Sequence, residues 1–543
     1  MKAGLIGGAI AALVALPGLG LGTLWDNSET TYGEIAREIL LTGNWIVMHL
    51  NGRPSFVQPP LYFWIAAVFS SALGPTALAM RLPSALATTL MGFFTAYAVA
   101  RQVGERVGIY AGIVLSCSLM QVIIGRLAIM DALLDAAVAM TIFWWFQAFS
   151  TGRNRYVIYG AIASACGFLA KGPVAPVVAV LVIAPYVLWS RRFERSQLPA
   201  PWSWVIGGLV LAFVVAPWFL AIAWQVDTHA VGMLLGRATI MRYSGVIENQ
   251  SGPFWYYVPV VILGLFPWTA FIPATVPYCF GALRASNEDP GQARLMRLCV
   301  CWAIVPFLFF SAARTKLPNY VALELPAFAV LVALYFDSVV RRSGTRAAAI
   351  SAATVPATVG LLAVAVWIFA RNNRLTVDLH SVSTGLIATA SPIFLGSLVA
   401  AVLFAGPAAR FAPYALGTGV VVAFTALSLL VLPQAERYKP VPRLAAVIQR
   451  DREPGDVVAI QSFSGSNALL FYSEPPVHVL APNEALSGVQ GESPRAVLCA
   501  SPRAWLIAPR DRQPEAGPER RHHVVATDGR AALILYDGTT CGP

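Results

Sequence analysis

Acidic side chains gather in one polar stretch near the N-terminus, where the neighbouring segments are apolar. The stretch runs from Leu24 to Trp64 and includes Asp26 and Glu29. These two carboxylates are spaced i, i+3, so on a helical turn they lie on one face. Carboxylates beside a bilayer are costly unless they are paired or used, which makes them candidates for chemistry. The alternative is an interfacial amphipathic helix with ordinary charged caps.

The elements that must position these carboxylates are predicted to be helices in a membrane. Apolar residues make up 57% and charged residues 12% of the 543 residues. Apolar segments of transmembrane length recur from Met1 to about Pro433, and alternating strands typical of a barrel are absent from the sequence. Because backbone amides in lipid must be satisfied within the segment, we expect an α-helical polytopic membrane protein. Glu34, Arg37 and Glu38 are expected on a solvated or interfacial helix face.

About thirteen transmembrane helices are expected within residues 1–433. Segment 59–74 is short for a span, so it is expected at the interface or as a half-helix. The expected spans are 4–22, 82–100, 107–124, 132–150, 156–170, 173–189, 203–224, 255–280, 298–312, 319–337, 347–370, 383–405 and 412–433.

The net charge of +11 could suggest a nucleic-acid partner, but we attribute it to cytoplasmic loops and anionic lipid head groups. With the N-terminus inside, the short loops with repeated arginines face the cytoplasm, as the positive-inside rule requires. We therefore expect the membrane, and no nucleic acid, as a partner. These loops contain Arg101, Arg106, Arg153, Arg155, Arg191, Arg192, Arg195, Arg284, Arg294, Arg297, Arg341, Arg342, Arg346 and Arg410.

The remaining basic residues of the membrane domain then lie on the outer face. Any one of them could snorkel or form a structural ion pair. For the set, a shared anionic ligand such as a lipid phosphate is the better explanation, because Arg and Lys supply phosphate-binding geometry. The set is Arg37, Arg53, Arg81, Arg126, Lys171, Arg237, Arg242, Arg314, Lys316, Arg371 and Arg374.

The composition changes at Gln434, and residues 434–543 are expected to form a small C-terminal α/β domain on the periplasmic side. VVAIQSF, AVLCAS, AWLIAPR and ALILYDG are predicted strands between Pro/Gly turns. A helix is predicted over Pro442–Arg450, where a proline begins it. Cys499 and Cys541 could form a disulfide there, although spacing alone cannot establish it.

Several separated motifs of the chain support a resemblance to a known family. They are LWDNSETTYGEIAREIL, TGNWIVMHLNG, PPLYFW, Asp131, FLAKGP, the arginine-bearing loop before PFWYYVP, FPW and ARTKLPNY, in that order. In these motifs the chain resembles the bacterial aminoarabinose transferases of lipid A, which belong to the protein-O-mannosyltransferase-like GT-C superfamily. The resemblance covers essentially the whole membrane domain and, more loosely, the tail.

The resemblance implies a GT-C fold and an inverting glycosyltransferase of the bacterial inner membrane. Its donor would be a sugar linked to polyprenyl (undecaprenyl) phosphate, and its acceptor a lipid A-like or other cell-envelope lipid or glycolipid at the periplasmic face. A phosphate leaving group needs cations that stabilise the departing anion. An acceptor hydroxyl needs a carboxylate base within hydrogen-bond reach.

The resemblance also implies roles for individual residues. Glu29 stands at the Glu of an Asp-Glu pair of the family, Ser28 occupies the Asp position, and Asp26 lies two residues earlier. Asp26, Glu29 and Asp131 are therefore the expected catalytic residues. The residues expected to bind the lipid phosphate or the sugar are Tyr32, Arg81, Lys171, Arg242, Arg314 and Lys316.

No catalytic metal and no cofactor are expected, because the family's metal-ligand positions are substituted. The family's Glu-Lys before the proline is Val57-Gln58 here, and its His before the loop arginine is Thr239. His229 and Glu248 could rebuild a site, but a surface histidine is more often only polar.

Structural roles remain open for three of these residues. Asp131 could be the N-cap of the helix over 132–150. Lys171 could bind the C-terminal carbonyls of a helix, and Arg81 could only anchor a helix end.

Two other functions remain open for the whole chain. A lipid flippase or transporter would use the same cations without chemistry, although the repeated halves typical of transporters are not visible in the sequence. A non-catalytic relative of the transferases is favoured by the substituted positions.

Overall fold

The computed structural model describes residues 1–25, 28–190, 198–236, 251–284, 289–372, 379–461, 463, 466–480, 492–510 and 521–537. The chain forms two compact units. The first unit comprises Met1–Leu19, Pro83–Arg126 and Met130–Val431. The second unit comprises Gly20–Leu82, Leu127–Ile129 and Leu432–Pro543. The predicted division into residues 1–433 and 434–543 stays a prediction.

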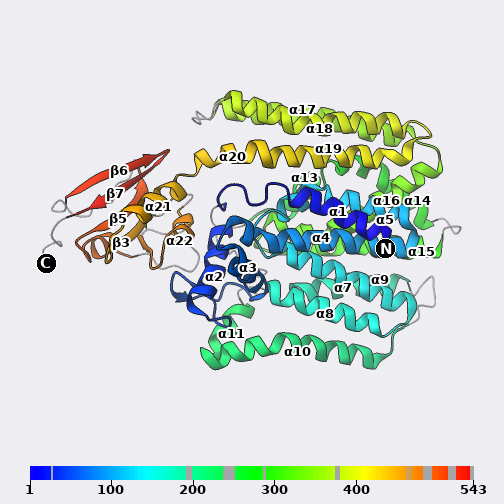
Figure 1. Cartoon of the computed structure of the whole chain (residues 1–543). Coiled ribbons are helices and arrows are strands. Elements are labelled where there is room, and N and C mark those ends of the chain that lie inside the picture. The colour runs from blue at the N-terminus through cyan, green and yellow to red at the C-terminus, as the bar shows by residue number, and fades with distance from the viewer. Residues whose placement is uncertain are drawn as a thin grey trace. The chain divides into compact units, whose positions relative to one another are not determined.

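The first unit is a bundle of apolar helices (Figure 1). Its N-terminal half contains α1 (Lys2–Ala15), most of α4 (Ala77–Val103), α5 (Glu105–Ser116), α6 (Leu119–Ile124), α7 (Asp131–Thr151), α8 (Arg155–Lys171), α9 (Val174–Ser190), α10 (Pro201–Gln225) and α11 (Thr228–Leu235). Its C-terminal half contains η2 (Phe254–Tyr256), α13 (Tyr257–Gly264), η3 (Trp268–Phe271), α14 (Ile272–Arg284), α15 (Pro290–Ala312), η4 (Pro318–Glu324), α16 (Leu325–Arg341), α17 (Arg346–Asn372), α18 (Leu379–Phe404), η5 (Ala409–Phe411), α19 (Ala412–Ala426) and η6 (Leu427–Val431).

Among the described residues, eight helices are long and apolar enough to cross a membrane, or nine if one bent pair counts as a single span. The expected count of thirteen is therefore not confirmed. The expected span 255–280 is bent by 104° between Gly264 and Trp268. The expected span 107–124 is interrupted between α5 and α6, and α1 and α9 are shorter than a full span. As predicted, segment 59–74 contains a short apolar helix, α3 (Leu61–Leu73).

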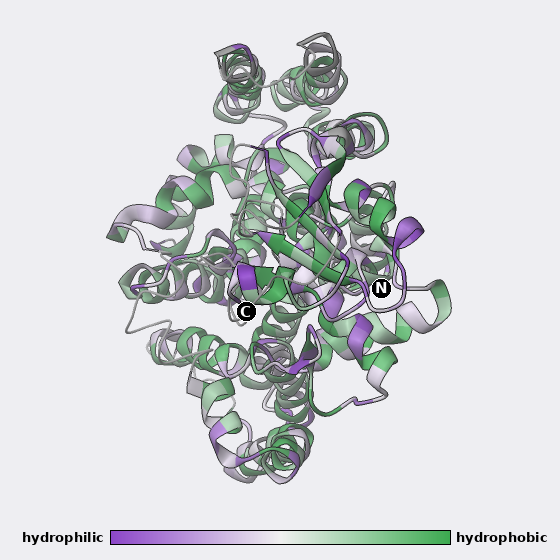
Figure 2. Cartoon of the chain, turned by 90° about the vertical axis from the view of Figure 1, so that its left-hand side faces the viewer, coloured by the Kyte–Doolittle hydropathy of each residue, from purple (hydrophilic) through white to green (hydrophobic). Residues whose placement is uncertain are grey.

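The apolar faces of the peripheral helices are exposed in the first unit. Phe213 and Trp224 of α10 are more than four-fifths exposed, and only 11% of the apolar window of α18 is buried. Green, hydrophobic segments occur in many of the helices in Figure 2. Such large apolar surfaces are stable in lipid, where the hydrophobic effect does not act against them. The chain is thus built as an integral membrane protein with several spans.

The second unit combines the polar N-terminal stretch with the C-terminal α/β fold. Its first part contains α2 (Ser28–Thr42), the hairpin of β1 (His49–Leu50) and β2 (Arg53–Pro54), and α3. Its last part contains α20 (Leu432–Ala435), η7 (Glu436–Tyr438), α21 (Pro440–Asp451), β3 (Val457–Gln461), α22 (Ala468–Tyr472), β4 (His478–Leu480), α23 (Pro494–Leu498), β5 (Ala504–Pro509), β6 (His522–Asp528) and β7 (Ala531–Tyr536).

The C-terminal part is built around one five-stranded sheet with the order β4-β3-β5-β7-β6. Strand β3 runs parallel to both β4 and β5, whereas β7 runs antiparallel to β5 and β6. Strand β7 is buried along its whole length, so it forms the centre of the core under α21. The predicted strands VVAIQSF, AWLIAPR and ALILYDG are confirmed as β3, β5 and β7, and the predicted helix as α21.

One predicted strand of this domain is wrong. AVLCAS lies at the end of α23, which begins at Pro494 and ends at Leu498. Proline suits the first turn of a helix, since the first N–H has no intrahelical acceptor. Cys499 is disulfide-bonded, whereas Cys541 lies outside the described residues, so their pairing stays a prediction.

The polar stretch and the C-terminal domain are held together by close packing of α2 on α22. A Cβ atom on Gly33 would lie 2.9 Å from Leu24 Cδ1 and 3.1 Å from Phe471 Cε2, so glycine permits this approach. Arg37 Nη2 donates to the carbonyl oxygen of Ser473 at 2.8 Å. Asn51 accepts from the Val477 N–H at 2.8 Å and donates to its carbonyl at 2.7 Å. These contacts fix the stretch that carries Glu29.

Candidate functional site

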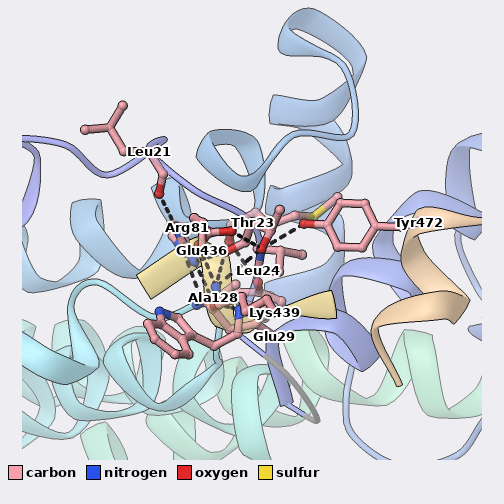
Figure 3. Close-up of polar contacts among 12 residues, drawn as sticks. Leu21, Thr23, Leu24, Glu29, Arg81, Ala128, Glu436, Lys439 and Tyr472 are labelled. Carbon is pink, nitrogen blue, oxygen red and sulfur yellow. Dashed lines mark hydrogen bonds and ion pairs between the residues drawn. The ribbon is translucent and has the colours of Figure 1, made fainter. Parts of the chain in front are cut away.

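Glu29 lies at the first turn of α2 and is only 2% exposed. Arg81 forms a bidentate ion pair with it, with Nε 2.9 Å from Oε1 and Nη2 2.8 Å from Oε2. The N–H groups of Ala128 and Trp25 each donate to one of its oxygens at 2.6 Å (Figure 3). A carboxylate has about four lone-pair sites. All of those on Glu29 are therefore engaged within the second unit.

Arg81 is equally engaged in this cluster. Its side chain is 6% exposed, and Nη2 also donates to the Thr23 carbonyl at 3.0 Å. Nη1 reaches the Leu21 carbonyl at 3.4 Å. A buried arginine needs such a set of acceptors, because the desolvation of its charge is otherwise uncompensated. The binding of a lipid phosphate by Arg81 stays a prediction.

Glu436 and Lys439 form a second charged pair, and both side chains bind Thr23. Glu436 accepts from Thr23 Oγ1 at 2.6 Å and from Lys439 Nζ at 2.8 Å. Lys439 also donates to the Thr23 carbonyl at 3.0 Å and lies 3.9 Å from the ring centroid of Trp25. Burial alone would raise the pKa of Glu436, but the hydrogen bonds from Lys439 and Thr23 lower it overall. Glu436 is therefore held as a carboxylate.

Residues 21–25 are thus anchored by four charged side chains and by Tyr472. The Leu24 N–H donates to the Tyr472 hydroxyl at 2.8 Å (Figure 3). Asp26 follows Trp25 directly in the sequence but lies outside the described residues. The sequence did not predict that Glu436, Lys439 and Tyr472 would take part, because they are more than 400 residues away from Thr23 along the chain.

The expectation of a solvated or interfacial face for Glu34 and Glu38 is wrong. Glu34 is 0% and Glu38 1% exposed, because α22 and the β1–β2 hairpin cover this side of α2. Arg37 holds Glu34 with Nε and Nη2 at 2.7 and 2.8 Å. The Gly52 N–H donates to both oxygens of Glu38 at 3.1–3.2 Å. Burial raises the pKa of Glu34 to about 8, against the opposing effect of Arg37.

Asp131 is the centre of a different cluster, which lies in the first unit. Its Oδ1 accepts from Lys171 Nζ and from Asn319 Nδ2, each at 2.5 Å. Lys171 Nζ also lies 5.7 Å from the ring centroid of Tyr320. Both donors to Asp131 share one oxygen, and its Oδ2 accepts no hydrogen bond from the described residues. Asp131 thus retains an acceptor for a further group.

The alternative role of Asp131 as an N-cap is wrong. Helix α7 begins at Asp131 itself, the capping position is Met130, and no side chain caps the helix. One turn later, Asp135 is buried, and its Oδ2 has no hydrogen-bond partner among the described residues. The i, i+4 spacing of the two aspartates is a sequence signal that could have indicated this cluster. Asn319, which was not among the predicted site residues, belongs to the ARTKLPNY motif.

Lys316 has a structural environment. Its Nζ donates to the carbonyls of Ser311 at 2.8 Å and Ala313 at 2.6 Å, at the C-terminal end of α15. It lies 5.6 Å from the ring centroid of Tyr257 and is 4% exposed. A cation is stabilised there by the carbonyl oxygens that end a helix. Arg314, in contrast, is exposed and has no ion pair among the described residues.

The other predicted site residues are placed as follows. Tyr32 packs edge-on against Tyr62 and Phe63 at 6.3 and 6.0 Å. Arg242, like Asp26, lies outside the described residues. Among the site residues that the structure describes, Glu29 and Arg81 form one group in the second unit, and Asp131 and Lys171 form another in the first.

A metal site was not expected. Gln58 is buried, and its Oε1 has no hydrogen-bond partner among the described residues. His229 is exposed on α11, whereas Thr239 and Glu248 lie outside the described residues. Within the described ranges no three His, Cys, Asp or Glu side chains are grouped so that they could hold a metal ion. The expectation that no metal acts here stays a prediction.

The chain is similar in sequence to one family model and to several known proteins. Residues 57–224 match the family model described as dolichyl-phosphate-mannose-protein mannosyltransferase. Undecaprenyl phosphate-alpha-4-amino-4-deoxy-L-arabinose arabinosyl transferase 2 of Proteus mirabilis is 31% identical over 319 residues, which are 58% of this chain and 55% of that protein. The arabinosyl transferase of Shewanella sediminis is 30% identical over 377 residues, 67% of this chain and 65% of that protein. The chain thus covers less than two thirds of these relatives.

Solved structures show the same fold over a larger range. ArnT from Cupriavidus metallidurans, crystallised with undecaprenyl phosphate, has a TM-score of 0.81 at 22% identity and covers 99% of both chains. The archaeal oligosaccharyltransferase AglB from Archaeoglobus fulgidus has a TM-score of 0.52 at 12% identity, over 94% of this chain and 69% of that one. The predicted GT-C type of helical membrane fold with a small C-terminal domain is confirmed. The predicted resemblance to the aminoarabinose transferases is also confirmed.

Proposed function

We propose that this chain is an integral membrane glycosyltransferase of the bacterial inner membrane. It transfers a sugar from a polyprenyl-phosphate-linked donor to a lipid A-like or other cell-envelope acceptor at the periplasmic face. The observation that carries the proposal is the anchoring of residues 21–25, where buried Glu29 and Arg81 on one side and Glu436 and Lys439 on the other hold the backbone that leads into Asp26. Four desolvated charges are a costly way to fix a loop that has no function.

In this proposal Asp26 is the general base, and Glu29 is a positioning residue. Asp26 takes the proton of the acceptor hydroxyl as its oxygen attacks the anomeric carbon of the donor. The bond to the lipid phosphate breaks with inversion, and the electron pair leaves with the phosphate. We assign the base to Asp26 rather than to Glu29, because Arg81, Ala128 and Trp25 already donate to the oxygens of Glu29. A base must have a free acceptor within reach of the proton.

Asp131 and the exposed cation Arg314 supply the remaining functions in the proposal. The Oδ2 atom of Asp131 accepts a hydroxyl of the bound sugar or acceptor, while Lys171 and Asn319 hold Oδ1 and fix its direction. Arg314 and Arg242 stabilise the charge on the departing phosphate. Lys316 orders the backbone next to Arg314, since it binds the last carbonyls of α15.

The test is sugar transfer in proteoliposomes with a polyprenyl-phosphate-linked sugar as donor. We expect Asp26→Asn to reduce kcat by about 100-fold or more, the usual range for the loss of a general base, with an unchanged thermal midpoint. Asp289→Asn is the matched control. Asp289 caps α15 through the Gly291 N–H, and asparagine caps equally well, so the control should retain full activity. Full activity in Asp26→Asn would reject the assignment of the base.

The same assay separates the transferase from the other two functions. The substituted positions Val57, Gln58 and Thr239 favour a non-catalytic relative, which would bind the donor without consuming it. A flippase would move the donor across the bilayer and leave its glycosidic bond intact. Consumption of the donor with release of polyprenyl phosphate occurs only in an enzyme.

A further inference from the structure

A groove in the first unit lies between α14, α16 and α17, and none of its lining residues belongs to the two clusters described above. Its volume is about 980 Å³, which is at the upper end of the range for small-molecule sites. Helix α16 begins next to η4, which carries Asn319 of the Asp131 cluster, and ends at the groove. Over seventeen residues this is a separation of about 25 Å along the helix. The groove is therefore a separate site.

The lining of the groove combines two kinds of side chain. Most lining residues are apolar or aromatic, including Pro277, Tyr278 and Ile350, and Ile350 is 64% exposed. Arg342 lies at the head end of the groove, where α16 has ended and the turn to α17 begins. Such a groove matches a molecule with a hydrocarbon part and an anionic head.

The charge at the head end is not neutralised within the described chain. Arg342 is exposed and has no acidic partner among the described residues. Its neighbour Arg341 differs, because Arg341 Nε pairs with Asp337 at 2.7 Å, and Arg106 holds the other oxygen of Asp337 at 2.6 Å. Arg346 begins α17 at the same end and likewise has no ion pair among the residues described. Arg342, which lines the groove, is thus available to an anion, and Arg346 adds positive charge four residues further along the chain.

The turn that carries Arg342 is held by backbone hydrogen bonds, which places Arg342 before a ligand binds. Ser343 and Gly344 have φ values of 58° and 101°, and the Gly344 N–H donates to the Val339 carbonyl at 2.9 Å. A Cβ atom on Gly344 would lie 2.6 Å from the Phe404 carbonyl oxygen, so only glycine fits here. The Thr345 N–H donates to the same carbonyl at 2.9 Å. Preorganisation reduces the entropy lost on binding.

We propose that this groove binds an anionic phospholipid of the bilayer, with its phosphate at Arg342 and its acyl chains along Pro277, Tyr278 and Ile350. The positive-inside rule predicts the arginine-bearing ends of α14, α16 and α17 at the cytoplasmic interface, where anionic lipids are attracted to basic residues. A zwitterionic lipid fits the apolar end equally well but gains less from Arg342. The preference for an anionic head group is therefore the property to test. The proposal does not depend on the transferase function.

The experiment is native mass spectrometry of the delipidated full chain in detergent, titrated with phosphatidylglycerol or with phosphatidylethanolamine of the same acyl chains. We expect the wild type to retain phosphatidylglycerol preferentially. Arg342→Ala should lower this retention about fivefold, the effect of one cation near an anionic head group, and should abolish the preference between the lipids. Arg341→Ala is the matched control, because Arg341 is paired with Asp337 and does not line the groove.

A second pair of variants tests the apolar end. A side chain at Gly281 enters open space in the groove, since nothing lies within 4 Å of its Cβ position. Gly281→Phe should reduce the retention of both lipids. Gly360→Phe, at an equally open position of α17 outside the groove, should reduce neither. Equal losses in Arg342→Ala and Arg341→Ala, or full retention in Gly281→Phe, would overturn the proposal.

Discussion

Glu29 and Asp131 are both buried carboxylates paired with a cation, but the two pairs are built differently. Glu29 accepts four hydrogen bonds that engage both oxygens, two from Arg81 and two from backbone N–H groups. Asp131 accepts two hydrogen bonds, both at Oδ1. The first arrangement is closed, because both oxygens of Glu29 already accept hydrogen bonds, and this agrees with the positioning role that we propose for Glu29. The second is open, because Oδ2 of Asp131 accepts no hydrogen bond from the described residues, and this agrees with the binding role that we propose for Asp131.

The largest expected effect follows from removing the charge of Glu29, which breaks its ion pair with Arg81. Glu29→Gln leaves the guanidinium of Arg81 buried beside a neutral partner, so the free energy of unfolding should fall by about 3–5 kcal/mol. The measurement is thermal or denaturant unfolding of the purified protein in detergent. Glu105→Gln is the control, because Glu105 is half exposed and pairs with the N-terminus, so its loss should have an effect below about 1 kcal/mol.

A double variant sharpens this result. In Glu29→Gln with Arg81→Met the uncompensated charge is gone, so part of the lost stability should return. Equal stability of Glu29→Gln and the wild type would contradict the closed arrangement.

A smaller effect, on activity rather than stability, is expected at the open pair. Asp131→Asn keeps an acceptor for Lys171 and Asn319 but removes the charge from Oδ2, the oxygen that we propose binds the sugar or the acceptor. We expect kcat for sugar transfer to fall by about 100-fold, with a smaller loss of stability than in Glu29→Gln, because the side chain of Lys171 is 12% exposed and that of Arg81 only 6%. The measurement is steady-state transfer in proteoliposomes, with Asp289→Asn as the control. A loss of stability as large as that of Glu29→Gln would show that Asp131 has the positioning role that we propose for Glu29.

Most of the described cations predicted on the outer face have contacts within the protein, so one shared phosphate site is not needed to explain them. Arg37, Arg81 and Lys171 each contact an acidic side chain, and Arg126 donates to the carbonyls of Val14, Ala15 and Pro17. Lys316 binds the carbonyls that end α15. These contacts account for five cations without a lipid phosphate. Arg314 remains as an exposed candidate that the structure describes.

The helical membrane fold was predictable, because long apolar segments can be recognised in a sequence without knowledge of tertiary contacts. Strands β3, β5 and β7 were also predictable, because Pro/Gly turns separate them, and α21 was predictable because a proline marks its first turn. The sequence could not predict that Thr23 would meet Glu436 and Lys439, since this contact depends on how distant segments fold onto each other. The burial of Glu34 and Glu38 was missed for the same reason, because α22 supplies the cover from the other end of the chain.

Glu34 and Arg37 form a third kind of pair. The smallest effect, on the pH dependence of the free energy of unfolding, is expected there. Burial of Glu34 raises its pKa from 4.5 to about 8, despite the ion pair with Arg37. The folded state therefore keeps a proton that the unfolded state has already released at neutral pH. Stability from this proton is present at low pH and is lost as the pH rises through about 8. Between about pH 7 and pH 9 the free energy of unfolding should fall by about 1.4 kcal/mol.

The test compares unfolding of the wild type and of Glu34→Gln over this pH range. Glutamine keeps an acceptor for Arg37 but has no proton to release, so the fall in stability between neutral and alkaline pH should be smaller than in the wild type. Glu105→Gln removes an exposed carboxylate and should leave the slope unchanged. If Glu34→Gln retains the full slope, Arg37 holds Glu34 as a carboxylate throughout. Its pair with Arg37 would then belong with the closed pair of Glu29 and Arg81.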